Sequence, residues 1–275
     1  MNDGQAMRDA FEKDGYCLVR GVLGAKRMAE IRSLLEDKFH ERFQDEDLLR
    51  ADIIPDHMVL YPELVDTFFN DRVLDAVRSL FGEEIVLLAF SAIRNSYNRL
   101  HSDFTTAEGT GARFFLKPDF QALTVGIYLQ DHDAQGGGLF VVPGSHKRRD
   151  PLVERRRLEK GIGVPLLAGI ARKLTGSRFP RYEDYAAFER GGYDLPTRAG
   201  DAVLLDMRLL HRGSKATASR TRTKLALFYH VSPPGERCDE HVAFLHSPAG
   251  HSHLNEVRDL APLVAAARGM GCTVL

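Results

Sequence analysis

The sequence is poor in cysteine, almost neutral in net charge and without a long hydrophobic run. Its three cysteines, Cys17, Cys238 and Cys272, are odd in number and widely spaced, which argues against a disulfide framework and for a reducing compartment. The formal net charge of -1 gives no global field that would attract nucleic acid or a membrane surface. No apolar run approaches the roughly 18 residues of a membrane-spanning helix, and the polar segment 1–16 has the character of neither a signal peptide nor a transit peptide. We therefore expect a cytoplasmic protein with no nucleic-acid and no membrane partner.

What is present is the composition of an ordinary soluble globular protein, with 44% hydrophobic and 27% charged residues in 275 positions. β-Barrels and sandwiches of this length often form one domain, so we expect residues 1–275 to be a single domain. The spacing of apolar residues predicts helices in the first part, and from Ile85 onward short strands separated by turn residues. The predicted helices are 5–13, 25–43 and 71–80, with a strand at 16–22, and the later strands are 85–92, 95–103, 112–117, 122–129, 138–142, 202–206 and 223–231. This order predicts a mainly β fold with flanking N-terminal helices, of sandwich or barrel type.

Two segments interrupt the strand pattern. Residues 147–190 contain 12 Lys/Arg against 6 Asp/Glu, a net charge of +6 in a chain of net charge -1. We expect this segment to form a lid-like insertion, and its charge favours an anionic substrate such as a carboxylate, a phosphate or a carrier-bound acyl group. Residues 255–268 are predicted to form a closing helix.

The most informative local motif is His101-Ser102-Asp103, at the end of a predicted strand. Residues two apart on a strand point the same way, so an imidazole and a carboxylate can reach one point. Two histidines and one carboxylate on one face of an octahedron leave three positions open, as in non-haem iron(II) oxygenases. A His-x-Asp triplet taken alone is more often a hydrogen-bonded pair at a strand end than a pair of metal ligands.

The best third ligand is His211, which follows a turn and an apolar strand at residues 200–206. Taken alone, His211 is more often a histidine in a surface loop, and only its occurrence together with the surrounding motifs favours the ligand interpretation. Further on, Arg220 and Arg222 stand at the entry to the strand 223–231, where a buried arginine could hold a dicarboxylate through a bidentate ion pair.

Together these motifs resemble the phytanoyl-CoA dioxygenase family over most of the chain. The similar segments are FEKDGYCLVRGVL near the N-terminus, HSD, GGGLFVVPGSHK at 136–147 and RAGDAVLLDMRLLHRGS at 198–214. The resemblance implies a double-stranded β-helix (jelly-roll or cupin-like) core, with iron(II) held by His101, Asp103 and His211. It also implies 2-oxoglutarate and O₂ as cosubstrates. The far carboxylate of 2-oxoglutarate would lie on Arg222, which follows His211 by the family spacing of 11 positions, with Arg220 as its rival. Lys215-Ala216-Thr217 departs from the family, which often has an asparagine here.

Strand alternation gives further candidates for the cavity. In 122–129 the apolar positions 123, 125, 127 and 129 share one face, so Thr124 and Tyr128 point to the other, toward the cavity. We take Thr124 as a cosubstrate contact and Tyr128 as a substrate contact. Tyr97 and Arg99 share the face of His101 and are the other substrate candidates, although plain barrel lining is the alternative for them.

The remaining histidines are expected to be structural. His146 fits a turn histidine near the site better than an extra ligand. His241, His246, His251 and His253 form a C-terminal group without an organised ligand pattern, so we interpret them as polar surface or pocket-rim residues. His251-x-His253 is the strongest candidate among them for a second metal site.

The predicted function is hydroxylation of an aliphatic C–H bond in a small molecule. Desaturation, cyclisation or epimerisation on the same site is an alternative, as is a β-helix protein that binds without turnover. A zinc hydrolase is a further one, because zinc also accepts His and Asp ligands. Halogenation requires chloride in the position that Asp103 fills and is disfavoured. The sequence does not specify the oligomeric state.

Overall fold

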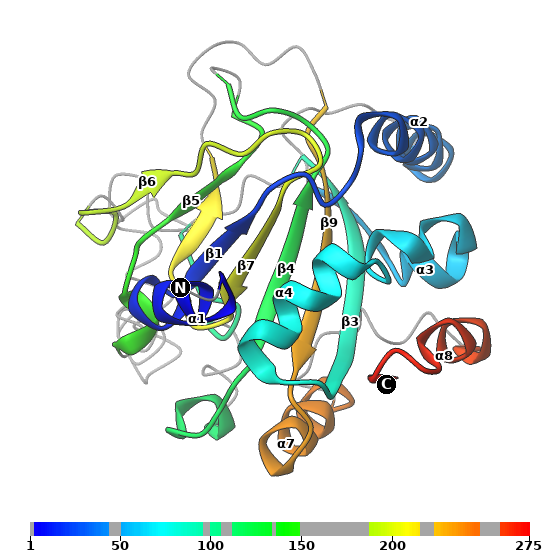
Figure 1. Ribbon diagram of the computed structural model, residues 1–275. Helices are drawn as coiled ribbons and strands as arrows, with labels where there is room; N and C mark the ends of the chain where they lie inside the picture. The colour runs from blue at the N-terminus through cyan, green and yellow to red at the C-terminus, as the bar shows by residue number, and fades with distance from the viewer. Residues whose placement is uncertain are drawn as a thin grey trace, which may run out of the picture.

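The chain folds around one large sheet that is covered by helices on one side. The computed structural model describes residues 3–43, 51–95, 100–105, 112–133, 136–148, 187–214, 223–247 and 259–275. The large sheet has the order β1-β7-β4-β9-β3-β10, with β2 paired to β3, and a smaller sheet has the order β6-β5-β8. Figure 1 shows the strands of the large sheet side by side, with α1 and α4 in front of them.

The bounds of the elements are as follows. The strands are β1 Tyr16–Val19, β2 Asp52–Pro55, β3 Ile85–Arg94, β4 Leu123–Tyr128, β5 Leu139–Val141, β6 Tyr193–Asp194, β7 Ala202–Asp206, β8 His211–Gly213, β9 Leu225–Ser232 and β10 Cys272–Val274. The α-helices are α1 Asp3–Asp14, α2 Ala25–Arg42, α3 His57–Leu60, α4 Asp71–Phe81, α7 Glu236–Leu245 and α8 Ala261–Ala267, and the 3₁₀ helices are η1 Pro62–Thr67, η3 Phe114–Leu116 and η4 Ser145–Lys147. Within the described ranges no helix combines the length and the apolar character needed to cross a bilayer.

The main core lies between the large sheet and the helices, and the sequence predicted its strand face correctly. Leu123, Val125, Ile127 and Leu129 belong to the same buried cluster as Leu35 of α2 and Val73 and Val77 of α4. The asparagine Asn70 caps α4, since its side chain accepts a hydrogen bond from the Val73 N–H. The predicted helices at 5–13, 25–43 and 71–80 are confirmed by α1, α2 and α4.

The other face of β4 and its neighbours meets the smaller sheet. A second buried cluster joins Tyr128, Val203 and Ala226 of the large sheet to Leu139 and Val141 of β5. The two sheets therefore enclose an inner space, as expected for the predicted β-helix core, and the inward residues of β4, β8 and β9 line it.

The predicted strand at 112–117 is wrong, because Phe114–Leu116 form the 3₁₀ helix η3. In a strand, Phe114 and Phe115 would point to opposite faces. In the helical turn both rings instead pack on Phe104, with ring centroids 5.7 Å and 4.6 Å away. Burying two adjacent phenyl rings in one cluster outweighs the strand preference of these residues.

Two other predicted elements are only partly correct. In the predicted strand 95–103, His101 forms a single bridge to His211 and residues 103–105 form a turn, whereas 96–99 lie outside the described residues. The closing helix α8 begins at Ala261, later than the predicted 255. Pro262 stands in its first turn, the part of a helix that tolerates proline.

Candidate metal centre

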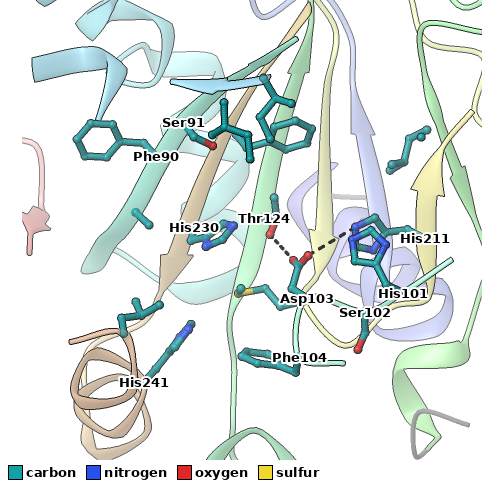
Figure 2. Close-up of a pocket in the computed structure, with 18 of the residues that line it drawn as sticks. Phe90, Ser91, His101, Ser102, Asp103, Phe104, Thr124, His211, His230 and His241 are labelled. Atoms are coloured by element: carbon teal, nitrogen blue, oxygen red, sulfur yellow. Dashed lines mark hydrogen bonds and ion pairs between the residues drawn. The ribbon is translucent and has the colours of Figure 1, made fainter. Parts of the chain in front are cut away.

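The structure brings His101, Asp103 and His211 together at one point. One ligand atom from each lies within 4.8 Å of the others. The backbones of His101 and His211 are paired in both directions, by N–H to O distances of 3.0 Å and 2.8 Å. This bridge sets the two imidazole rings 4.4 Å apart, centroid to centroid, and Figure 2 shows both beside the carboxylate.

The ring of His211 is held in an orientation that frees one nitrogen. Its Nδ1 lies 2.9 Å from the carbonyl oxygen of Leu209, so the protonated Nδ1 donates there and the Nε2 lone pair remains. That Nε2 lies 3.6 Å from the Asp103 Oδ1. A hydrogen bond from the outer nitrogen of a histidine to a carbonyl is the usual way in which proteins orient a metal-binding imidazole.

The carboxylate of Asp103 is fixed in the same manner. The Thr124 hydroxyl donates to Oδ2 at 2.8 Å, leaving Oδ1 to face His211. The backbone N–H of Asp103 donates to the carbonyl of Met207 at 2.9 Å, which holds the turn against the loop before His211. Thr124, predicted to contact the cosubstrate, thus lines the cavity and supports the carboxylate.

The charge of Asp103 is set by opposing effects. Burial raises the pKa of this carboxyl, but the imidazoles of His211, His230 and His101 and the hydrogen bond from Thr124 lower it, and the net pKa lies below its ordinary value. The group is therefore a carboxylate at neutral pH. Two imidazole nitrogens and one anionic oxygen at a single point are a donor set that fits a divalent transition metal.

The three residues lie at the wall of a cavity of about 270 Å³ between the sheets and α7. Tyr128, a predicted substrate contact, lines it, and its buried hydroxyl has no hydrogen-bond partner among the described residues. Lys224 also lines it, is 4% exposed, and donates from Nζ to the Gly138 carbonyl at 2.7 Å. The cavity thus combines polar groups on one part of its wall with apolar side chains elsewhere, as ligand pockets commonly do.

Several predicted site residues lie outside the described part of the chain. These are Tyr97, Arg99, Arg220, Arg222, His251, His253 and most of the insertion 147–190. The structural interpretation of His146 agrees with its contact, since its Nε2 lies 3.1 Å from the Glu12 carbonyl and fastens η4 to α1. His246 is exposed, as expected for a surface residue.

Sequence reasoning missed three titratable residues of the cavity wall: Lys224, His230 and His241. Alternation could have indicated Lys224 and His230, because Lys224 directly precedes β9 and stands an even number of positions before His230. For His241 the expectation of a surface or rim position is wrong, since this residue is 1% exposed. The physical reason is that α7 turns this position inward against the rings of Phe104, Phe114 and Phe120.

A β-helix core that gathers two histidines and an aspartate in a cavity between its sheets has the donor set typical of non-haem iron(II) oxygenases. The family model described as Phytanoyl-CoA dioxygenase (PhyH) matches residues 11–223, and the chain belongs to this family. This confirms the resemblance predicted from the sequence.

Similar proteins agree with this assignment. An ectoine dioxygenase of Nocardia farcinica is 24% identical over 243 residues, which cover 80% of this chain and 75% of the relative. Among solved structures, HygX from Streptomyces hygroscopicus with nickel and 2-oxoglutarate bound has a TM-score of 0.56 and 21% identity, covering 85% of this chain and 87% of HygX. The α-ketoglutarate-dependent epimerase SnoN has a TM-score of 0.55 and 19% identity, covering 84% and 81%. These likenesses confirm the predicted double-stranded β-helix.

Proposed function

We propose that this enzyme hydroxylates an aliphatic C–H bond of a small molecule, using Fe(II), 2-oxoglutarate and O₂. The observation that carries the proposal is the convergence of His101, Asp103 and His211 on one point of a buried cavity wall. These residues are separated by up to 110 positions in the chain, and hydrogen bonds orient two of them so that a ligand atom faces inward.

In this proposal His101, Asp103 and His211 hold the iron, and 2-oxoglutarate lies beside it. When bound, the iron with its cosubstrates supplies oxidation of a C–H bond to an alcohol, coupled to conversion of 2-oxoglutarate and O₂ to succinate and CO₂. The protein's part is to orient and to exclude water. The hydrogen bond from Thr124 stabilises the charged form of Asp103 and orients its carboxylate. The cavity between the sheets and α7 holds the substrate.

The proposal is tested by adding Fe(II) and then 2-oxoglutarate anaerobically to the metal-free protein. A visible charge-transfer band that needs both additions is expected from an iron-bound 2-oxo acid. A screen of small metabolites for stimulated succinate release in air then identifies the substrate. A protein that binds zinc but gives neither the band nor any consumption of 2-oxoglutarate would instead support the zinc hydrolase or the non-catalytic alternative.

We propose that Arg222, the second arginine of the segment 220–222, binds the far carboxylate of 2-oxoglutarate. Its support is the spacing of 11 positions from His211 and the placement of Lys224, two positions further on, in the cavity wall. Replacing Arg222 by Ala should raise KM for 2-oxoglutarate about 10- to 100-fold, since a bidentate charge-assisted pair is lost. Steady-state succinate release measures this, with Arg220→Ala as the matched control. A larger effect at Arg220 would reverse the assignment.

The substrate is proposed to carry an anionic group, attracted by the insertion 147–190, which acts as a lid of the single domain. The support is the net charge of +6 in this segment. The triple charge reversal of Arg155, Arg156 and Arg157 to Glu should then raise KM several-fold for an anionic substrate and leave KM for a neutral analogue unchanged. Equal KM values for the anionic substrate in both proteins would remove this proposal.

The other proposed substrate contacts are Tyr128, Tyr97 and Arg99. For Tyr128 the support is its buried hydroxyl, which lies in the cavity wall and has no partner among the described residues.

Three free cysteines, two of them buried, support a reducing compartment and so the cytoplasm. Epimerisation is the second candidate outcome because one structural neighbour is an epimerase; product analysis by chiral chromatography separates it from hydroxylation.

A further inference from the structure

The imidazole of His241 occupies a place among phenylalanine rings at the α7 end of the cavity. Its ring centroid lies 5.4 Å from that of Phe104, 5.3 Å from Phe114 in a stacked arrangement, and 5.9 Å from Phe120. The residue is 1% exposed and yet lines the cavity. Figure 2 shows its side chain reaching from α7 toward the space below His230 and Asp103.

One nitrogen of the polar imidazole of His241 is left unsatisfied by the described part of the protein. Its Nδ1 is buried and has no hydrogen-bond partner among the described residues. Buried polar atoms are nearly always paired, and each exception calls for a reason. A phenyl ring would pack among the same three phenylalanines without that cost, so packing alone does not account for a histidine here.

The electrostatic surroundings of His241 select a neutral ligand. Burial lowers the pKa of His241 to about 3, His230 lowers it further, and Asp103 opposes both. The imidazole is therefore uncharged at neutral pH and offers one nitrogen as donor and one as acceptor. Asp103 lies in the same cavity wall, so in the metal-free protein a carboxylate or phosphate placed beside His241 would meet this anion and an uncharged imidazole. The cation Lys224 lines the cavity as well, and an anionic group would be drawn toward it.

We propose that His241 determines specificity by hydrogen bonding to a neutral hydroxyl, carbonyl or amide group of the substrate. The hydrocarbon part of that substrate packs on Phe104, Met207, Phe244 and Leu245, which line the same part of the chain's cavity. This inference rests on the proposed function, in that it takes the cavity beside the metal centre as the substrate pocket. Any anionic group of the substrate then lies at another part of the cavity, away from His241.

The test uses three probes with one ring and different polar groups: cyclohexanol, cyclohexanecarboxamide and cyclohexanecarboxylate. Each is titrated into the full chain labelled with ¹⁵N-histidine, first without metal and then with zinc and 2-oxoglutarate, and binding is followed by NMR. We expect the two neutral probes to shift the His241 resonances and to bind at least about 5-fold more tightly than the carboxylate. His241→Phe should weaken the neutral probes about 5- to 10-fold, the usual effect of losing one hydrogen bond.

The controls separate recognition from packing. His246→Phe makes the same change at an exposed position just after α7 and should leave all three affinities unchanged. His241→Gln keeps a donor and an acceptor, so it should retain affinity for the neutral probes within about 3-fold, and it also serves if His241→Phe does not fold. The melting temperature of His241→Phe should equal or exceed that of the wild type, because an unpaired buried nitrogen is removed.

The inference is overturned if, in the metal-free protein, the carboxylate binds as tightly as the neutral probes, or if His241→Phe binds cyclohexanol and the amide as the wild type does. These binding results do not depend on iron or turnover. Failure of 2-oxoglutarate-dependent succinate release with intact His241-dependent binding would therefore count against the proposed function alone.

Discussion

Replacing Asp103 by Asn should weaken Fe(II) binding by more than about 100-fold and reduce succinate release to background. The substitution keeps the size of the side chain but removes the negative charge that offsets the metal and converts one oxygen to an amide donor. Loss of an outer-shell partner commonly costs 10- to 100-fold in metal affinity, and a direct ligand should cost more. Affinity is measured anaerobically by competition with a chromophoric chelator.

Thr124→Val gives the graded comparison for this prediction. Valine has nearly the same shape but does not donate the 2.8 Å hydrogen bond to Oδ2, so iron affinity should fall about 10- to 100-fold while the three ligands remain. Asp119→Asn, on an exposed carboxylate paired with Arg237, is the control and should bind iron as the wild type does. Unchanged affinity in Asp103→Asn would mean that the metal lies elsewhere.

The three proposed ligands could be found from the sequence because local rules place two of them. Strand alternation predicts His101 and Asp103 on one side, and a turn followed by an apolar strand precedes His211. The prediction brings the pair together correctly, although Asp103 stands in a turn after the His101 bridge and not in a strand. What the sequence does not reveal is how they are oriented. The bond from Thr124 joins residues 21 positions apart, and the bond from His211 to the Leu209 carbonyl depends on the shape of a loop.

The α7 side of the cavity was not predictable in the same way. His241 lies on a helix whose inward face is set by the contacts of His241 and Phe244 with Phe114. The segment of η3 was misread as a strand because Phe114 and Phe115 are residues that favour strands. Strands β2, β8 and β10 were also missed, because they are short and their partners are distant: β10 pairs in parallel with β3, about 190 positions earlier. Long-range contacts, rather than local preference, determine this part of the fold.

The second large effect is expected at Arg94, whose replacement by Met should lower the free energy of unfolding by about 3–5 kcal/mol. Arg94 and Asp52 are each 2% exposed, and Nε and Nη2 of the arginine donate to Oδ2 at 2.9 Å and 2.6 Å. Removing one partner leaves a buried carboxylate without its guanidinium, which costs far more than the pair itself contributes. Urea unfolding followed by circular dichroism measures the difference.

The double variant Arg94→Met with Asp52→Leu separates the cost of an unpaired buried charge from the effect of the ion pair on the register of β2 against β3. Replacing both members by apolar groups should recover most of the lost stability. A cost below about 1 kcal/mol in the single variant, or no recovery in the double variant, would contradict the role of Arg94 as the partner that offsets the buried charge of Asp52.

The two residues are paired in register across β2 and β3, and their neighbours Ile53 and Ile93 line the cavity. If the ion pair fixes the register of that wall, the double variant should fold with near-native stability and yet release more succinate per substrate oxidised, because a displaced wall admits water and loosens the substrate.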